Sequence, residues 1–309
     1  MRLVADIGGT NSRLAIADAG QLRPGSTRSF RNEDFASFDA VVDAYLTADD
    51  GPAPEEFVVA VAGPVDGDTA RLTNRNWEIS APRLAARLGE GRGKIINDLV
   101  ALGYSVPQLG PEDMLTVANG TPENASPRQS LVVGIGTGFN VSPVVEQGDT
   151  LLCLRAEFGH TALPASIAKA MDARQAGLSE SFPTVEHCFS GRGFSEVCRQ
   201  VTGRTASAPE ALMRLCDEGD PAISDAVGFY AELMGRLNRE LMLTYLPTNG
   251  VYFAGSVARS ILTRAFCTRF RDITARAYPV ATHATTPAFV ITADTAALHG
   301  CAQVPLDRD

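Results

Sequence analysis

Two short turns rich in glycine and threonine are the first residues in the chain that suggest chemistry. Gly8-Gly9-Thr10-Asn11 joins two apolar, alternating runs, and Gly136-Thr137-Gly138 joins two more. Small residues let backbone N–H groups point into a shared concavity that favours an anion, and Thr and Asn side chains add further donors. Each turn taken singly is more simply an ordinary hairpin turn. The presence of both predicts two loops that hold a triphosphate between them.

Carboxylates stand close to the first turn and at the end of a buried strand. Asp6 precedes that turn, where a carboxylate is suited to hold Mg²⁺ directly or through water, or else to accept a hydrogen bond within the turn. Asn97-Asp98 follows the strand-like run Lys94-Ile95-Ile96, and open α/β sheets bind ligands at strand ends. A lone Asp98 there suits a general base; the alternative, an N-cap for a helix starting at Leu99, does not exclude that role.

A second acidic cluster has the composition of a sugar site. Glu157-Phe158-Gly159-His160 places a carboxylate and an imidazole three residues apart, and Glu186 precedes His187-Cys188. Carboxylates and neutral imidazole pair with the adjacent hydroxyls of a sugar. The alternatives are surface charges, a satisfied histidine, or a zinc site made by the two histidines and the cysteine. That zinc site lacks a second cysteine pair, so we expect no zinc.

The sequence does not match either of two better-known phosphate-binding motifs. The segment 89–94 approaches a P-loop, but Leu88 occupies the position of its first glycine and Ile95 replaces the required Ser or Thr. The segment 134–139 lacks the third glycine of the dinucleotide fingerprint. We therefore expect neither a P-loop nor a dinucleotide site.

The composition limits the class of protein. The 309 residues carry 27 Lys and Arg against 36 Asp and Glu, a formal net charge of −9. Because no basic run is present, we expect no nucleic-acid partner. No run approaches the roughly 20 apolar residues that cross a bilayer, and no secretory signal is seen, so we expect no membrane partner and a cytoplasmic location. Six scattered cysteines fit a reducing compartment.

The apolar pattern predicts one structural plan used twice. Each copy has a β-hairpin around a Gly/Thr turn and a later buried strand ended by glycine: 3–7, 13–17 and 57–62 in the first copy, 131–135, 140–145 and 251–254 in the second. Helices are predicted at 82–88 (with Ser80 as N-cap), 208–215, 221–246 and 295–303. Alternating strands and helices predict an α/β fold, and clustered Pro and Gly predict a domain boundary near 105–125.

These motifs, taken in order, resemble those of bacterial glucokinase, within the superfamily of actin-like ATPases that includes hexokinase. The resemblance runs from Arg2 to about residue 303. No single motif is decisive, but the ordered set is specific. It comprises Asp6 to Asn11, Ala62 to Val65, Leu72 to Trp77, Asn97-Asp98, Gly134 to Gly138, Glu157 to His160 and Glu186 to Gly191.

The resemblance implies two RNase H-like α/β domains around a central cleft. The smaller domain is expected at 1–108, joined by the C-terminal helix at about 295–309, and the larger at 109–294. The implied activity is ATP-dependent phosphorylation of glucose to glucose 6-phosphate, with ATP and Mg²⁺ as cofactors. The implied partners are the sugar, the nucleotide and, as a homodimer, a second copy of the chain.

The resemblance also implies roles for individual residues. Asp98 looks like the base for the sugar's 6-hydroxyl, and Asp6 looks like a helper for Mg²⁺. The implied sugar-side residues are Asn97, Gly138, Glu157, His160 and Glu186. The implied nucleotide-side residues are Asp6, Gly8, Gly9, Thr10, Asn11, Gly136, Thr137 and Gly255.

Departures from the family pattern leave alternatives open. The second turn reads Gly138-Phe139-Asn140-Val141 where the family usually has Gly-Leu-Gly, and Gly255-Ser256 replaces a Gly-Gly pair; both bear on nucleotide binding. The cysteine-rich zinc motif of the related ROK kinases is missing after His160. The alternatives are a kinase for another hexose, such as mannose, fructose or an amino sugar, and a catalytically inactive sugar sensor.

Overall fold

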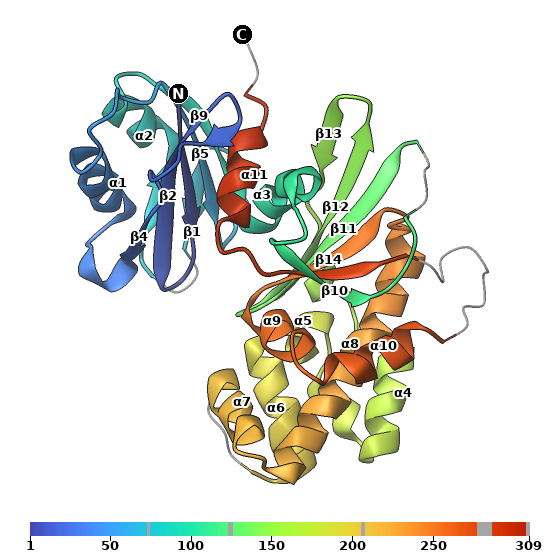
Figure 1. Cartoon of the computed structure of the whole chain (residues 1–309). Helices are drawn as coiled ribbons and strands as arrows, with labels where there is room; N and C mark the ends of the chain where they lie inside the picture. The colour runs from blue at the N-terminus through green and yellow to red at the C-terminus, as the bar shows by residue number, and fades with distance from the viewer. Residues whose placement is uncertain (73–74, 123–125, 205–207, 277–285, 307–309) are drawn as a thin grey trace. The chain divides into compact units, whose positions relative to one another are not determined.

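The computed structural model divides the chain into two compact units. It describes residues 1–309 except 73–74, 123–125, 205–207, 277–285 and 307–309 (Figure 1). Unit 1 comprises Met1–Leu109 and Ala293–Asp309, and unit 2 comprises Gly110–Thr292. Each unit has a central sheet with its own hydrophobic core, so each is described separately below.

The sheet of unit 1 has the strand order β3-β2-β1-β5-β9, with β4 also paired to β2. Its main strands are β1 (Arg2–Ile7), β2 (Asn11–Asp18), β5 (Glu56–Val61) and β9 (Arg92–Asn97), and its short ones are β3 (Gln21–Leu22) and β4 (Arg28–Arg31). Strands β1 and β2 form an antiparallel hairpin, whereas β1, β5 and β9 are parallel. The parallel strands therefore end at one common edge, which carries Ile7, Val61 and Asn97. A separate small sheet contains β6 (Val65–Asp66), β7 (Thr69–Arg71) and β8 (Glu78–Ser80).

Alternating residues of these strands bury both faces of the sheet. Leu3, Ala5 and Ile7 pack with α1 (Phe38–Thr47) and α2 (Ala81–Arg87) on one face. Val4 and the other strand residues whose side chains point to the opposite face pack there with α3 (Asp98–Ser105) and α11 (Ala296–Gln303). Two 3-10 turns, η1 (Asn32–Asp34) and η2 (Val106–Gln108), complete unit 1. The strands of this unit thus follow the period of two that the sequence predicts.

Helices α11 and α3 pack unusually closely. A Cβ at Gly300 would overlap the carbonyl oxygen of Ala101, so only glycine permits this crossing. The far end of α11 is held by Arg2, whose guanidinium donates to the carbonyls of Ala302 and Val304 at 2.9 and 2.8 Å. The last helix of the chain is therefore an integral layer of unit 1.

The sheet of unit 2 repeats the plan of unit 1. Its order is β10-β15-β14-β11-β12-β13, with bounds Met114–Ala118, Ala288–Ile291, Gly250–Ala254, Arg128–Ile135, Phe139–Gln147 and Thr150–Cys153 respectively. Strands β11 and β12 form an antiparallel hairpin, and β14 lies parallel to β11. This arrangement matches β1, β2 and β5, so the predicted duplication is confirmed.

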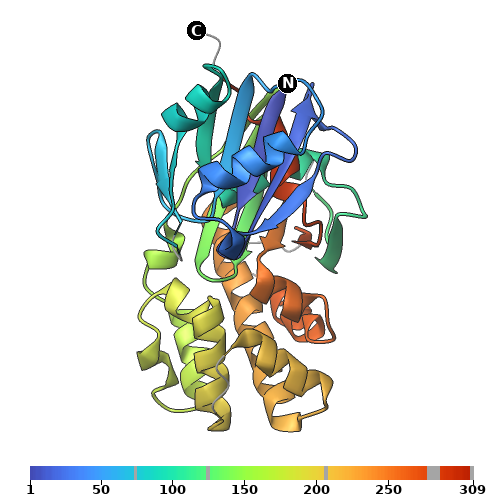
Figure 2. The ribbon, with the colours of Figure 1, turned by 90° about the vertical axis from the view of Figure 1, so that its left-hand side faces the viewer.

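The helices of unit 2 gather beyond one side of its sheet, as Figures 1 and 2 both show. The long helix α8 (Pro221–Tyr245) is central to them, and Asp220 caps it by accepting from the N–H groups of Ala222 and Ile223 at 3.0 and 3.1 Å. The others are α4 (Ala165–Arg174), α5 (Val185–Cys188), α6 (Gly191–Thr202), α7 (Pro209–Asp217), α9 (Ser256–Leu262) and α10 (Cys267–Thr274), with η3 (Phe158–His160) and η4 (Leu178–Ser181).

The predicted α/β class and the four predicted helices are confirmed, with small shifts at their ends. Ser80 occupies the predicted N-cap position of α2, although its side chain makes no capping hydrogen bond. Pro82 follows within the first turn of this helix, and a proline there has no N–H that needs a partner. In the described part of the chain, no helix combines the length and apolarity needed to span a membrane.

Candidate active site

Asp98 lies where strand β9 gives way to helix α3. Asn97 is the N-cap of that helix, and its Oδ1 accepts from the N–H of Leu99 at 3.0 Å. The Oδ1 of Asp98 accepts from the same N–H at 2.9 Å. Asn97 also donates through Nδ2 to the carbonyl of Gly63 at 3.4 Å. The capping position predicted as the alternative for Asp98 therefore belongs to Asn97, and Asp98 is the first residue of the helix.

The environment of Asp98 suits a group that exchanges a proton near neutral pH. The residue is half-buried, and the net effect of its surroundings raises the pKa of its carboxyl from 3.8 to about 7. Desolvation is the largest cause and the carboxylate of Asp6 the second, whereas hydrogen bonds from Leu99 and Asn97 oppose this rise. A general base works best when its pKa is close to the operating pH.

Asp6 lies at the same sheet edge as Asp98. It is near the carboxyl end of β1, Asp98 follows β9, and β5 runs between these two parallel strands. Its cross-strand neighbour Arg13 brings a guanidinium nitrogen to 3.7 Å from Oδ2, and the same side chain reaches Asp294 at 4.0 Å. Unit 1 thus brings two carboxylates together beside the first glycine turn.

Asn32 braces the first turn from the neighbouring segment. Its Nδ2 donates to the carbonyl of Gly8 at 2.8 Å, and its backbone N–H donates to that of Thr10 at 2.8 Å. The hydroxyl of Ser12 donates to its Oδ1 at 2.8 Å. Asn32 is fully buried, so it fixes the turn through the carbonyls. Sequence reasoning missed this residue, because nothing near position 32 signals a contact with residues 8–12.

The backbone amides of both turns remain available for a ligand. Over the described ranges of the chain, the N–H groups of Gly9, Thr10, Thr137 and Gly138 have no hydrogen-bond partner. Thr10 and Thr137 are also exposed. Grouped N–H donors of this kind favour an anion. The structure is therefore compatible with a phosphate contact at each turn.

The second turn is packed against other glycines of unit 2. The Gly136 N–H donates to the carbonyl of Gly138 at 3.0 Å, and the Gly191 N–H donates to the carbonyl of Gly136 at 2.7 Å. Gly255 precedes α9 with a φ of +94°, and a Cβ there would overlap the carbonyl oxygen of Ile135. The predicted nucleotide-side residues Gly136, Thr137 and Gly255 are thus brought together in one unit.

Glu186 connects the second turn to the predicted sugar residues. Its Oε2 accepts from the N–H of Phe139 at 3.0 Å, and a Cβ added to Gly138 would lie 2.8 Å from that same oxygen. Its other oxygen lies 4.0 Å from the guanidinium of Arg192. Glu186 comes from α5, where Thr184 is the N-cap. This contact was not foreseen, because its partners are 47 residues apart.

Glu157 and His160 form a solvent-exposed pair at η3. Their side chains are 76% and 73% exposed, and Nε2 of His160 lies 3.8 Å from Oε2 of Glu157. Asn140 donates through Nδ2 to the same Glu157 oxygen at 3.1 Å. Such exposed, adjacent donors and acceptors are suited to a polyhydroxylated ligand. Unit 2 therefore gathers Gly138, Glu157, His160 and Glu186, while unit 1 carries Asn97 and Asp98.

Two of the residues considered as ligands of a zinc site, His187 and Cys188, have other surroundings in the structure. His187 has its Nδ1 2.7 Å from the hydroxyl of Thr184, and Cys188 is fully buried. Burial raises the pKa of the Cys188 thiol above its ordinary value. Across the residues that the structure describes, no three His, Cys, Asp or Glu side chains cluster as metal ligands would.

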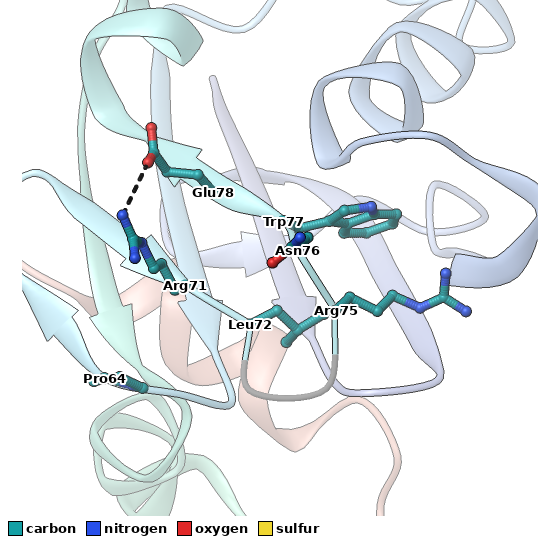
Figure 3. Close-up of a pocket in the computed structure, with 7 residues that line it drawn as sticks. All are labelled: Pro64, Arg71, Leu72, Arg75, Asn76, Trp77 and Glu78. Carbon is teal, nitrogen blue, oxygen red and sulfur yellow. Dashed lines mark ion pairs between the residues drawn. The ribbon is translucent and has the colours of Figure 1, made fainter.

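A hollow of about 710 Å³ opens beside the small sheet of unit 1 (Figure 3). Arg71 pairs with Glu78 at 3.8 Å, and Arg75 lies 5.8 Å from the centre of the Trp77 ring, pointing away from Arg71. Thr73 and Asn74, which belong to the 72–77 motif of the family resemblance, lie outside the described residues. The lining includes Pro64 but none of the predicted site residues.

A smaller hollow of about 250 Å³ lies in unit 2 beside Gly255. Its lining includes Ser256 and Ser260 of α9 and residues of α7, with the Asp217–Arg264 ion pair at 3.3 Å on its wall. It is therefore adjacent to the glycines of the second turn, on the side of the unit where the sequence predicts nucleotide contacts.

Comparison with known sequences identifies close relatives. The protein-family model described as "Glucokinase" matches residues 3–307. A glucokinase of Stenotrophomonas maltophilia is 33% identical over 284 residues, covering 87% of this chain and 84% of the relative. A glucokinase of Salmonella typhi is 31% identical over 268 residues, covering 84% of this chain and 82% of the relative.

Solved structures share the fold across nearly the whole chain. A glucokinase from an Antarctic psychrotroph has a TM-score of 0.81 at 24% identity, covering 98% of this chain and 97% of its own. A Balamuthia mandrillaris glucokinase in complex with glucose has a TM-score of 0.72 at 19% identity, with coverages of 97% and 92%. A ROK family glucokinase from Streptomyces griseus, in complex with glucose and AMPPNP, has a TM-score of 0.58 at 18% identity, with coverages of 97% and 98%.

Proposed function

Because the chain belongs to the glucokinase family and is an ATP-dependent kinase that phosphorylates glucose, we propose that Asp98 is the general base of the transfer. The observation that carries this role is its pKa of about 7 at the carboxyl edge of the unit 1 sheet. A carboxyl with an ordinary pKa near 4 is a much weaker base toward a sugar hydroxyl. Desolvation at this strand end therefore supplies the basicity.

The proposed step moves one proton and one phosphoryl group. Asp98 accepts the proton of the glucose 6-hydroxyl as that oxygen attacks the γ-phosphorus and the bond to the ADP oxygen breaks. The amides of Gly9, Thr10, Thr137 and Gly138, which have no partner among the described residues, are the proposed donors to the phosphate oxygens. Positioned donors of this kind stabilise the charge of the transition state without reorganisation.

Asp6 is the proposed Mg²⁺ residue. Its carboxylate is 18% exposed and offers the hard oxygen donors that Mg²⁺ takes, either directly or through water. When bound, Mg²⁺ supplies charge neutralisation on the phosphates. Arg13, 3.7 Å from the Asp6 carboxylate, keeps that carboxylate oriented across the hairpin.

Asn97, Glu157, His160 and Glu186 are the proposed sugar ligands, with Gly138 beside them. Support comes from the exposed Glu157–His160 pair and from the contact of Glu186 with the second turn. The glucose complexes of the Balamuthia and Streptomyces proteins agree with a sugar site in this fold. A panel of glucose, mannose, fructose and glucosamine in a coupled assay of ADP release tests which hexose the enzyme prefers.

We also propose that the protein works in the cytoplasm as a homodimer. The described cysteines are all free thiols, which agrees with a reducing compartment. Sedimentation velocity at micromolar concentration tests the dimer; a single species of 32.7 kDa contradicts it.

Substitution of Asp98 tests the base. We expect Asp98→Ala to lower kcat by about 10³-fold while the glucose dissociation constant stays within about threefold, because proton removal is lost and the sugar ligands remain. Asp68→Asn, an exposed aspartate of the same unit, is the matched control. Turnover of Asp98→Ala near that of the control excludes this residue as the base.

The pKa of Asp98 also predicts two opposite pH dependences. Since the base acts ionised, log(kcat/KM) for glucose should rise with a slope of about one below pH 7 and level off above it. The stability of the folded protein should show the opposite dependence and decrease as the pH rises. Between pH 4 and 7 Asp98 stays protonated in the folded state but is ionised in the unfolded state, so its contribution to the free energy of unfolding falls by roughly 1 kcal/mol per pH unit as the pH rises.

Asp98→Asn provides the matched comparison for this pH effect. The amide oxygen keeps an acceptor for the Leu99 N–H but cannot ionise. We therefore expect the variant to be inactive yet more resistant to denaturant than the wild type at pH 8, with little difference at pH 4. Parallel unfolding curves for the two proteins across this pH range contradict the raised pKa.

A further inference from the structure

Asn140 makes three hydrogen bonds that join strand β12 to the turn carrying Glu157. Its Oδ1 accepts from the N–H of Val141 at 2.9 Å and from the N–H of Phe158 at 3.1 Å. Its Nδ2 donates to Oε2 of Glu157 at 3.1 Å. The backbone of Asn140 is itself fixed, because it pairs with Gly134 in the β11–β12 hairpin. The Asn140 side chain thus connects the β11–β12 hairpin to an exposed carboxylate.

The orientation of this amide is determined by its surroundings. Two backbone N–H groups point at one end of the Asn140 side chain, so that end must be the carbonyl oxygen. Rotating the amide by 180° would bring its NH₂ group against both donors and an oxygen against the Glu157 carboxylate. The NH₂ group is therefore directed at Glu157 by contacts that do not involve the Glu157 side chain.

Glu157 depends on this donor for a defined position. Its side chain is 76% exposed, and among the described residues its second polar side-chain contact is with His160, whose Nε2 lies 3.8 Å from the same oxygen. An exposed glutamate without a fixed partner distributes over several rotamers, and ordering it on binding costs affinity. The Asn140 contact holds the carboxylate before the ligand arrives. The Phe158 N–H contact holds the backbone of the same turn.

We propose that Asn140 is a positioning residue for the sugar: it fixes the Glu157 carboxylate and thereby lowers the KM for glucose and sharpens the choice among hexoses. This inference rests on the proposed role of Glu157 as a sugar ligand. Asn140 does not touch the reacting atoms. Its loss therefore affects the occupancy of the site more than the rate of transfer in the occupied site.

Asn140→Asp is the variant that isolates this role. Aspartate keeps the shape of the side chain and an oxygen for the N–H groups of Val141 and Phe158, so the turn stays anchored. It replaces the donor facing Glu157 with a negatively charged oxygen. We expect the KM for glucose to rise at least tenfold, the KM for ATP to stay within twofold, and kcat at saturating glucose to stay within about threefold.

Two further variants separate this inference from the proposed function. Glu157→Gln alone tests the sugar role of Glu157. The double variant Asn140→Asp/Glu157→Gln restores a donor–acceptor pair with reversed polarity, so its glucose KM should lie well below the product of the two single effects. Asn249→Asp is the matched control, since Asn249 contacts Ser130 at the opposite end of β11 at 3.1 Å.

Each outcome has one meaning. If Glu157→Gln leaves the glucose KM unchanged, the sugar role of Glu157 is wrong, and the role of Asn140 falls with it. If Glu157→Gln raises that KM but Asn140→Asp does not, the inference about Asn140 alone is wrong. Equal rises in the KM for ATP and glucose, or a melting temperature lowered far more than in the control, show a merely structural residue and also overturn it.

Discussion

The two glycine turns are built on the same hairpin but are held in different ways. In unit 1 the turn at 8–11 is braced by a neutral, buried amide, because Asn32 binds the carbonyls of Gly8 and Thr10. In unit 2 the turn at 136–138 is braced by a carboxylate, since Glu186 accepts from the N–H of Phe139. Both leave two amides without a partner in the described chain.

The difference shows how a duplicated element acquires separate tasks. Among the described residues, a Cβ at Gly8 would meet the carbonyl oxygen of Asn11 alone, at 3.4 Å, which is ordinary contact. A Cβ at Gly138 would meet Glu186, and one at Gly255 would overlap the backbone that leads into the turn. The first turn is therefore an open loop on a neutral support, whereas the second is close-packed against residues proposed to bind the sugar.

The largest effect is expected at Gly255, where both geometry and packing require glycine. Gly255→Ala would place a Cβ against the carbonyl of Ile135 at a φ of +94°. The backbone cannot move away from this Cβ without a large cost in free energy. We therefore expect kcat/KM for ATP to fall at least 100-fold and the free energy of unfolding to fall by about 2–4 kcal/mol. Steady-state kinetics and urea unfolding measure the two effects.

Gly148→Ala is the control for this variant. Gly148 also has a positive φ, +58°, but a Cβ there would meet none of the described residues within 4 Å. It should cost only about 1 kcal/mol and leave the kinetics unchanged. Equal losses in the two variants would show that backbone conformation alone, and not the packing of the second turn, sets the cost.

An intermediate effect is expected at Gly138. The added Cβ of Gly138→Ala would lie 2.8 Å from Oε2 of Glu186, and a carboxylate can move aside. We expect the fold to be kept, with a melting temperature within about 3 °C, while Glu186 leaves the Phe139 N–H and the KM for glucose rises about tenfold. A change confined to the KM for ATP would contradict the connection between this turn and the sugar residues.

The smallest effect is expected at Gly8. Gly8→Ala adds a Cβ with space around it, so stability should change by less than about 1 kcal/mol and the KM for ATP by less than about threefold. Enzyme assays with ATP as the varied substrate measure this. An effect as large as that of Gly138→Ala would remove the contrast between the two turns.

Local sequence signals predicted the features that depend on neighbouring residues. Period-two alternation identified the strands, glycine marked the turns, and Asn97-Asp98 stood out because polar residues end a buried strand. These features were sufficient for the α/β class, the duplicated plan and, with the ordered motifs, the family. The residue roles stay predictions until the variants are measured.

Features that depend on distant contacts were not predictable in this way. Asn32 lies 24 residues from Gly8, and Glu186 lies 47 residues from Phe139. Asn140 stood out only as a departure bearing on the nucleotide, whereas its side chain contacts Glu157. Propensity and periodicity carry no information about which side chains meet across such separations, because the meeting is set by tertiary packing.

The closure of unit 1 by α11 has a consequence for how the protein is made. One face of that sheet is covered by α3, the helix that begins with Asp98, but lacks its α11 layer until residues 296–303 leave the ribosome. All 183 residues of unit 2, 110 to 292, are translated in between. At 5–20 residues per second, this interval lasts roughly 10–40 s. The nascent chain therefore exposes part of this apolar strand surface throughout that time, and α11 packs against α3, the helix that begins with Asp98, only after unit 2 has been translated.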